Sequence, residues 1–71
     1  MTTRGLTATV ERRLRRIIAR AEIGTLLPSE RALAEALDAS RTTIRLVYLK
    51  LATEGLVAPE HGRGYVVVRR G

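Results

Sequence analysis

The chain has 71 residues, of which 45% are hydrophobic and 28% are charged. This length allows one small globular domain, excludes a two-domain enzyme and leaves little room for a deep substrate cavity. Thirteen lysine and arginine side chains against seven aspartates and glutamates give a formal net charge of +6. Such a balance favours a polyanionic partner, either nucleic acid or an anionic membrane surface.

Residue types that are absent from the sequence narrow the function classes. The chain has no cysteine and a single histidine, so we expect no disulfide, no metal site and no cofactor. No nucleophile, carboxylate pair or metal set has the spacing of a catalytic site, so we expect no enzyme. Because Trp and Phe are also missing, duplex DNA is a better partner than RNA or single strands. No segment resembles a signal peptide or a membrane span, and we expect a cytoplasmic protein.

The first predicted helix covers residues 7–21, with Thr7 or Thr9 as its N-cap. Its other faces carry several arginines, which form either a solvated surface or a phosphate-contacting one. Gly24 and Pro28 then predict a connecting loop over 22–28. The prediction of this first helix rests on five apolar residues with helical spacing: Val10, Leu14, Ile17, Ile18 and Ala21.

Two further helices are predicted close together. Ser29 is placed to cap a short helix over 29–37, and Ser40 to cap a third helix over 41–54 that ends at Gly55. Only a few residues separate the two helices, which is the helix-turn-helix layout. The apolar stripe of the third helix has helical spacing: Ile44, Val47, Tyr48 and Leu51.

The end of the chain predicts a β-hairpin. Residues 56–58 and 65–68 favour β-structure, and the prolines and glycines of 59–64 are turn signals. A hairpin directly after the third helix is a wing, spanning about 56–68. The predicted fold class is therefore α+β, a single winged helix-turn-helix domain over 1–71, with three helices followed by a two-stranded β-hairpin wing.

An ordered set of short motifs runs through the chain: Gly24-Thr25-Leu26-Leu27-Pro28-Ser29-Glu30-Arg31, Leu33-Ala34, Ser40-Arg41-Thr42-Thr43-Ile44-Arg45, Leu51, Glu54-Gly55-Leu56-Val57 and His61-Gly62-Arg63-Gly64. Over roughly residues 10–68 this set resembles the winged helix-turn-helix domain of the GntR family of bacterial transcription regulators. The chain departs from the family pattern before the second helix, where Ala21 and Ile23 replace a common glycine and proline. It departs again in the third helix, where Leu46 and Leu49 replace polar residues.

The resemblance implies a DNA-binding surface and a wider architecture. It places Arg31 and the wing tip near the DNA backbone or minor groove, and it implies a C-terminal domain that binds a small-molecule effector and dimerises. We expect that domain to be absent from this chain, which is either an excised domain or a truncated member. The isolated domain is expected to be a monomer, and the full-length protein a homodimer on an inverted-repeat operator. The residues implied to face the major groove are Arg41, Thr42, Thr43 and Arg45, and those of the wing tip are His61, Gly62 and Arg63.

The chemistry of these side chains fits that role. Arg41 and Arg45 lie at i and i+4 on one helical face, and arginine pairs with guanine O6 and N7. Thr42 and Thr43 can bind phosphate and contact thymine methyl groups. Ser40 either caps the helix or contacts a phosphate, and both interpretations stay open.

Alternative interpretations also stay open for the wing tip and for the function of the domain. Arg63 either enters a narrow minor groove or lies in an ordinary turn, and His61 either donates to a phosphate or is simply solvated. A winged helix that binds proteins without reading DNA is the alternative function. A membrane-surface role for the first helix is a third option, although that helix lacks Trp and Phe.

Overall fold

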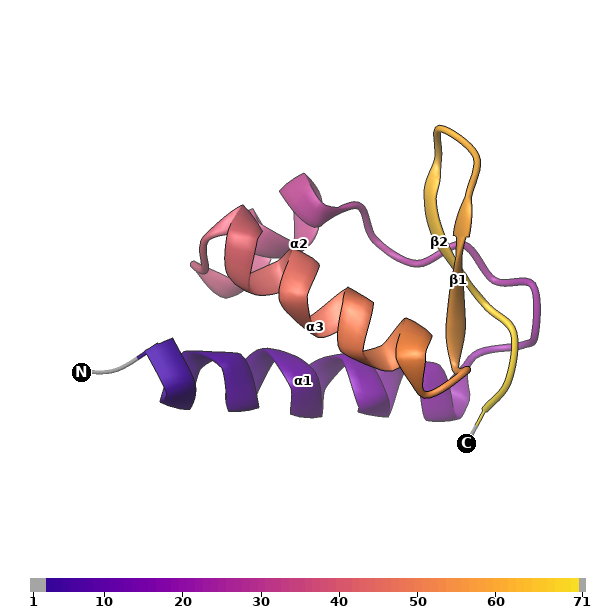
Figure 1. The fold of residues 1–71 in the computed structure, drawn as a ribbon, viewed down its shortest axis with the longest axis horizontal. Coiled ribbons are helices and arrows are strands. Elements are labelled where there is room, and N and C mark those ends of the chain that lie inside the picture. Colours follow the sequence, from indigo (N-terminus) through magenta and orange to yellow (C-terminus); the bar gives the residue numbers. More distant parts are fainter. Residues whose placement is uncertain (1–2, 71) are drawn as a thin grey trace.

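The computed structural model describes residues 3–70, and the side chains of residues 7–70 (Figure 1). Three helices precede one antiparallel hairpin, as the sequence predicted. The hairpin rises away from α1, beside the C-terminal end of α3 (Figure 1). The elements are α1 (Thr3–Arg20), α2 (Glu30–Leu37), α3 (Arg41–Thr53), β1 (Val57–Glu60) and β2 (Gly64–Val67).

Helix α1 begins earlier than predicted. Thr7 and Thr9 lie inside the helix that starts at Thr3, so the prediction that either one is the N-cap was wrong. Threonine costs less than about 0.7 kcal/mol relative to alanine in a helix interior. A threonine hydroxyl alone therefore does not stop a helix.

The caps of α2 and α3 are confirmed. The Ser29 hydroxyl accepts a hydrogen bond from the amide of Ala32 at 3.0 Å, and the Ser40 hydroxyl accepts one from the amide of Thr43 at 3.0 Å. Between the helices Asp38 adopts the left-handed conformation, with φ of 54°. That reversal makes the turn short enough for α3 to begin three residues after Asp38.

The core is built around α3, against which both α1 and α2 pack. Tyr48 is its largest fully buried side chain, and its hydroxyl donates to the carbonyl of Pro28. Its ring stacks on Tyr65 of the wing, with centroids 4.4 Å apart and an interplanar angle of 10°. One side chain of α3 thus fixes both the wing and the loop before α2.

The wing differs from the prediction at its tip. Strand β1 continues through Pro59, which lies opposite Tyr65, and ends at Glu60 opposite Gly64, so the turn is shorter than predicted. The amide of Arg63 donates to the Glu60 carbonyl at 2.8 Å and closes this turn. The sequence reading also missed that the loop before α2 joins the sheet, through a bridge between Leu26 and Val66.

Candidate nucleic-acid interface

The N-terminal end of α3 presents a polar surface to solvent. Arg41 and Thr42 are exposed in its first turn, and within the described chain the Arg41 guanidinium takes part in no ion pair. The amide groups of a first helical turn carry a partial positive charge that suits a phosphate oxygen. The first turn of α3 therefore combines an unpaired guanidinium, a hydroxyl and a favourable helix end.

Arg45 lies one turn later and is held by Glu30 at the start of α2. Its Nη2 lies 3.0 Å from Glu30 Oε1, and its Nε lies 3.2 Å from Oε2. The hydrogen bond with Glu30 raises the pKa of Arg45 above its ordinary value. The Arg45 side chain is still 57% exposed, against 19% for Glu30. The carboxylate thus orients the guanidinium without covering it.

Thr43 does not belong to this surface. Its residue is only 4% exposed, and its hydroxyl oxygen accepts a hydrogen bond from the Ser40 hydroxyl at 2.9 Å. The prediction that Thr43 faces the major groove was wrong, because its side chain points into the domain. The Ser40 hydroxyl also accepts a hydrogen bond from the Thr43 amide, so its single donor hydrogen and one acceptor position are both used by Thr43. Of the two interpretations of Ser40, the structure shows the cap.

The remaining predicted residues are exposed on α2 and on the wing. Arg31 lies on α2, with its Nε 3.5 Å from Glu35 Oε2, and both side chains are more than 70% exposed. His61, Gly62 and Arg63 form the exposed turn of the wing, whose tip points away from α1 (Figure 1). An exposed ion pair such as that of Arg31 with Glu35 is worth about 0–1 kcal/mol, so it holds the Arg31 guanidinium only weakly.

Sequence reasoning missed Glu30 as part of the site. The sequence shows Glu30 only as one residue of a motif, yet its carboxylate makes an ion pair with Arg45. The two residues lie 15 positions apart. Glu30 was visible in the motif Ser29-Glu30-Arg31, but the sequence alone does not show that its carboxylate pairs with Arg45.

The two residues of α3 that depart from the pattern of the family, Leu46 and Leu49, lie at the surface. Leu46 and Leu49 are 54% and 49% exposed, so the helix that carries Arg41 and Arg45 also presents apolar side chains.

Among residues 3–70 no group of three His, Asp or Glu side chains could hold a metal ion. No helix in that range is long and apolar enough to cross a bilayer.

Comparison with known proteins identifies the family. The sequence model of "Bacterial regulatory proteins, gntR family" matches residues 6–67. The Fatty acid metabolism regulator protein of Escherichia coli O1:K1 is 45% identical over 40 residues, which are 56% of this chain and 17% of that protein. The Fatty acid metabolism regulator protein of Yersinia enterocolitica matches with the same identity and coverage. The chain thus spans about a sixth of the length of these relatives.

Solved structures show the same fold. PhnF from Mycobacterium smegmatis superimposes with a TM-score of 0.78 at 35% sequence identity, over 84% of this chain and 26% of that one. The N-terminal domain of AraR, in its complex with mutant ORR3, gives a TM-score of 0.83 at 26% identity, over 89% of this chain and 93% of that one. The matched family and the Fatty acid metabolism regulator proteins are described as regulators, as the sequence led us to expect. The chain belongs to the gntR family of bacterial regulatory proteins.

Proposed function

We propose that this DNA-binding domain of a bacterial transcription regulator binds duplex DNA sequence-specifically, with α3 in the major groove. The observation that carries the proposal is the exposed face of α3, where Arg41, Thr42 and Arg45 lie within two turns of the helix N-terminus. Side chains at this end of a recognition helix reach base edges in helix-turn-helix proteins. Thr43 is not part of the proposed contact set, because it is buried.

Each arginine has a distinct proposed role. Arg41 has no ion pair among the described residues and is proposed to read a guanine through paired hydrogen bonds to O6 and N7. Arg45 is proposed to read a second base, with Glu30 fixing the direction of its guanidinium. Glu30 can itself accept a hydrogen bond from cytosine N4. Arg31 on α2 is proposed to contact a phosphate and so to position the helix.

The wing tip is proposed to contact the minor groove or the adjacent backbone. Arg63 lies between Gly62 and Gly64, which have no side chains and whose φ values are both positive. An exposed arginine of this kind is attracted to the negative potential of a narrow minor groove. His61 is proposed to donate a hydrogen bond to a neighbouring phosphate.

The wider setting of the domain is part of the proposal. The full-length protein is proposed to act in the cytoplasm as a homodimer on an inverted-repeat operator, with a small-molecule effector bound outside residues 1–71. Each protomer would then contact one half-site, and half-site spacing would follow the two-fold symmetry. A monomeric domain with one half-site's contacts is expected to bind weakly and with a steep salt dependence.

The test is an amide chemical-shift titration of the labelled 71-residue chain with a generic DNA duplex, followed by addition of salt. We expect shifts at residues 40–46 and 61–64 that reverse as salt rises. Selection from random duplexes then supplies a preferred site for affinity measurements. Shifts confined to the arginines of α1, or equal affinity for selected and random duplexes, would refute sequence-specific reading by α3.

A further inference from the structure

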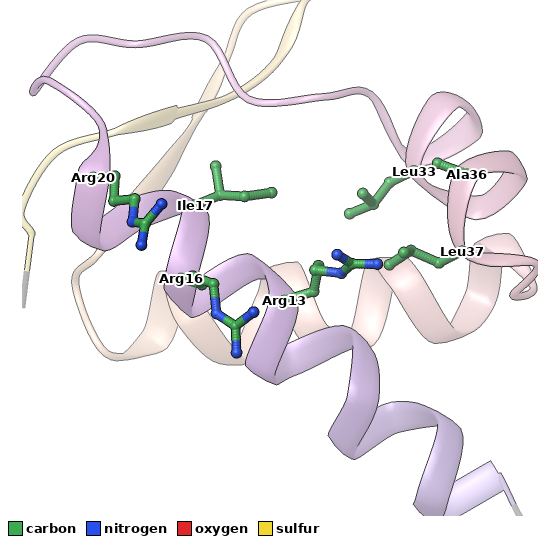
Figure 2. A pocket seen from close by; sticks show the side chains of 7 residues that line it. All are labelled: Arg13, Arg16, Ile17, Arg20, Leu33, Ala36 and Leu37. Carbon is green, nitrogen blue, oxygen red and sulfur yellow. The ribbon is translucent and has the colours of Figure 1, made fainter.

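A groove lies between α1 and α2, apart from the proposed DNA-contacting residues. It encloses about 400 Å³. Both helices pack against α3 and hardly against each other, so a channel remains open between them. Figure 2 shows arginines reaching out from α1 beside Ile17, with Leu33 and Leu37 facing them from α2. The lining residues are Arg13, Arg16, Ile17, Arg20, Leu33, Ala36 and Leu37.

The groove has an apolar floor and a cationic rim. Leu33 is buried, Ile17 and Leu37 are half-buried, and Ala36 is exposed. Arg13, Arg16 and Arg20 are exposed, and none of their guanidinium groups takes part in an ion pair or hydrogen bond with the side chains of residues 7–70 or the backbone of residues 3–70. Arg15 on the same helix behaves differently, because its guanidinium is bound by both Glu11 and Glu54. The three arginines of the rim thus carry charges that no acidic side chain within residues 7–70 neutralises.

We propose that this groove docks an acidic amphipathic helix of a partner protein. The apolar face of that helix would cover Ile17 and Leu37, and its carboxylates would pair with the arginines of the rim. The arginines at 13, 16 and 20 span roughly 10 Å along α1 at 1.5 Å per residue. A partner helix that runs alongside repeats its own side chains with the same rise, so carboxylates at i, i+3 and i+7 match all three arginines.

Charge complementarity selects this occupant over the others. A symmetric contact with a second copy would set the three arginines against three identical ones, at a cost in repulsion. A DNA backbone could pair its phosphates with the arginines, but it has no apolar group that would cover the floor of the groove. An amphiphile with a single anionic head would leave two of the three arginines unpaired.

The test measures binding of a labelled peptide to the 71-residue chain by fluorescence anisotropy. The peptide has about 16 residues, with leucines at i, i+3, i+4 and i+7 and glutamates on both flanks. We expect Arg16→Ala and Arg20→Ala each to weaken binding roughly two- to fivefold at low salt. Ala36→Gln places a longer side chain in the groove from an exposed position and is expected to abolish binding while the domain stays folded.

Matched controls separate the groove from general attraction to a basic protein. Arg12 is exposed on the same helix but does not line the groove, so Arg12→Ala is expected to leave peptide binding unchanged. A peptide with serine in place of leucine is expected not to bind. Equal losses for Arg12→Ala and Arg16→Ala, or binding that survives Ala36→Gln, would overturn the proposal.

The other occupants give different results. If sodium dodecanoate shifts the Ile17 and Leu37 methyl resonances and the peptide does not, the proposal is overturned in favour of a small amphiphile. Dimerisation lost in Ala36→Gln would assign the groove to a second copy. We expect Arg16→Ala to leave the DNA-induced shifts of α3 and the wing intact. If Arg16→Ala abolishes those shifts, Arg16 contacts DNA and the groove proposal is overturned. If the shifts are absent in the unmodified chain and in every variant, the proposed DNA binding is refuted and the groove proposal is not affected.

Discussion

The guanidinium of Arg45 on α3 is bound by the carboxylate of Glu30 on α2, with Nη2 3.0 Å from Oε1 and Nε within 3.3 Å of both carboxylate oxygens. The pair joins the two helices of the helix-turn-helix on their exposed side. An arginine that is held in one direction loses less rotamer freedom when it binds a base. Glu30 is therefore proposed to act as a positioning residue for the proposed base contact.

Arg45→Ala is expected to weaken binding to a selected duplex on the order of tenfold to a hundredfold and to relax discrimination at one base pair. Glu30→Gln removes a negative charge from the interface, so we expect tighter binding to random duplex and poorer discrimination. The affinities of both variants for selected and random duplexes check this. If Glu30→Gln strengthens both complexes by the same factor, Glu30 only competes with DNA for Arg45.

Ser40→Ala is expected to lower the free energy of unfolding by roughly 0.5–2 kcal/mol, because the first turn of α3 loses its cap. The same change removes the hydrogen bond that the Ser40 hydroxyl donates to the buried Thr43 hydroxyl. Ser29→Ala is the matched control, since the Ser29 hydroxyl caps α2 without a buried partner. Urea denaturation should show the larger loss for Ser40→Ala. Equal losses would mean that the contact with Thr43 adds nothing.

Tyr48→Phe is expected to cost about 1 kcal/mol, the typical net value of one hydrogen bond, because it removes the donor to Pro28. Tyr65→Phe keeps the ring stack and serves as the control. Burial raises the pKa of Tyr48 above its ordinary value of 10.0. Its contribution to stability is complete below pH 10 and is lost as the pH rises further, because the unfolded chain ionises first. An alkaline loss of equal size in Tyr48→Phe would contradict this assignment.

Acid is expected to weaken the contact between α1 and α3. Hydrogen bonds from Lys50 and Arg15 hold the pKa of Glu11 below its ordinary value of 4.5, and Arg15 does the same for Glu54. Both pKa values are depressed by folding, so the stabilisation is present above about pH 4.5 and declines as the pH falls through the folded-state values. Urea midpoints measured against pH check this.

The double variant Glu11→Gln/Glu54→Gln provides the comparison for the acid effect. Its stability is expected to fall less steeply between neutral and acidic pH than that of the unmodified chain. Glu22 is exposed and its carboxylate has no ion pair within residues 3–70, so Glu22→Gln is the control. The same pH slope in the double variant and in the unmodified chain would remove this network as the cause.

Much of the fold was readable from local signals. The Ser29 and Ser40 caps and the apolar stripe of α3 set two helices and their separation, and the β-favouring runs set the wing. Each of these signals acts within a few residues. The pairing of Leu26 with Val66 was not readable, because it joins segments 40 residues apart in the sequence. The same holds for the ion pair of Arg45 with Glu30.

Thr43 shows where a motif misled the interpretation. The motif around Ser40 implied that consecutive polar residues all face DNA. Thr43 precedes Val47 by four positions and Leu51 by eight, so helical periodicity places it on the buried stripe. The structure follows the periodicity. A helix exposes only part of its circumference, and a run of polar residues therefore includes some that point inward.

The bridge between Leu26 and Val66 also decides which side of the wing can meet another chain. The amide of Val67 donates to the Thr25 carbonyl at 3.0 Å, so within residues 3–70 β2 has neighbours on both sides and β1 forms the open edge. Pro59 lies within β1 and has no amide hydrogen. An incoming strand would meet an interrupted row of donors. The domain is thereby protected against intermolecular sheet formation when it is concentrated.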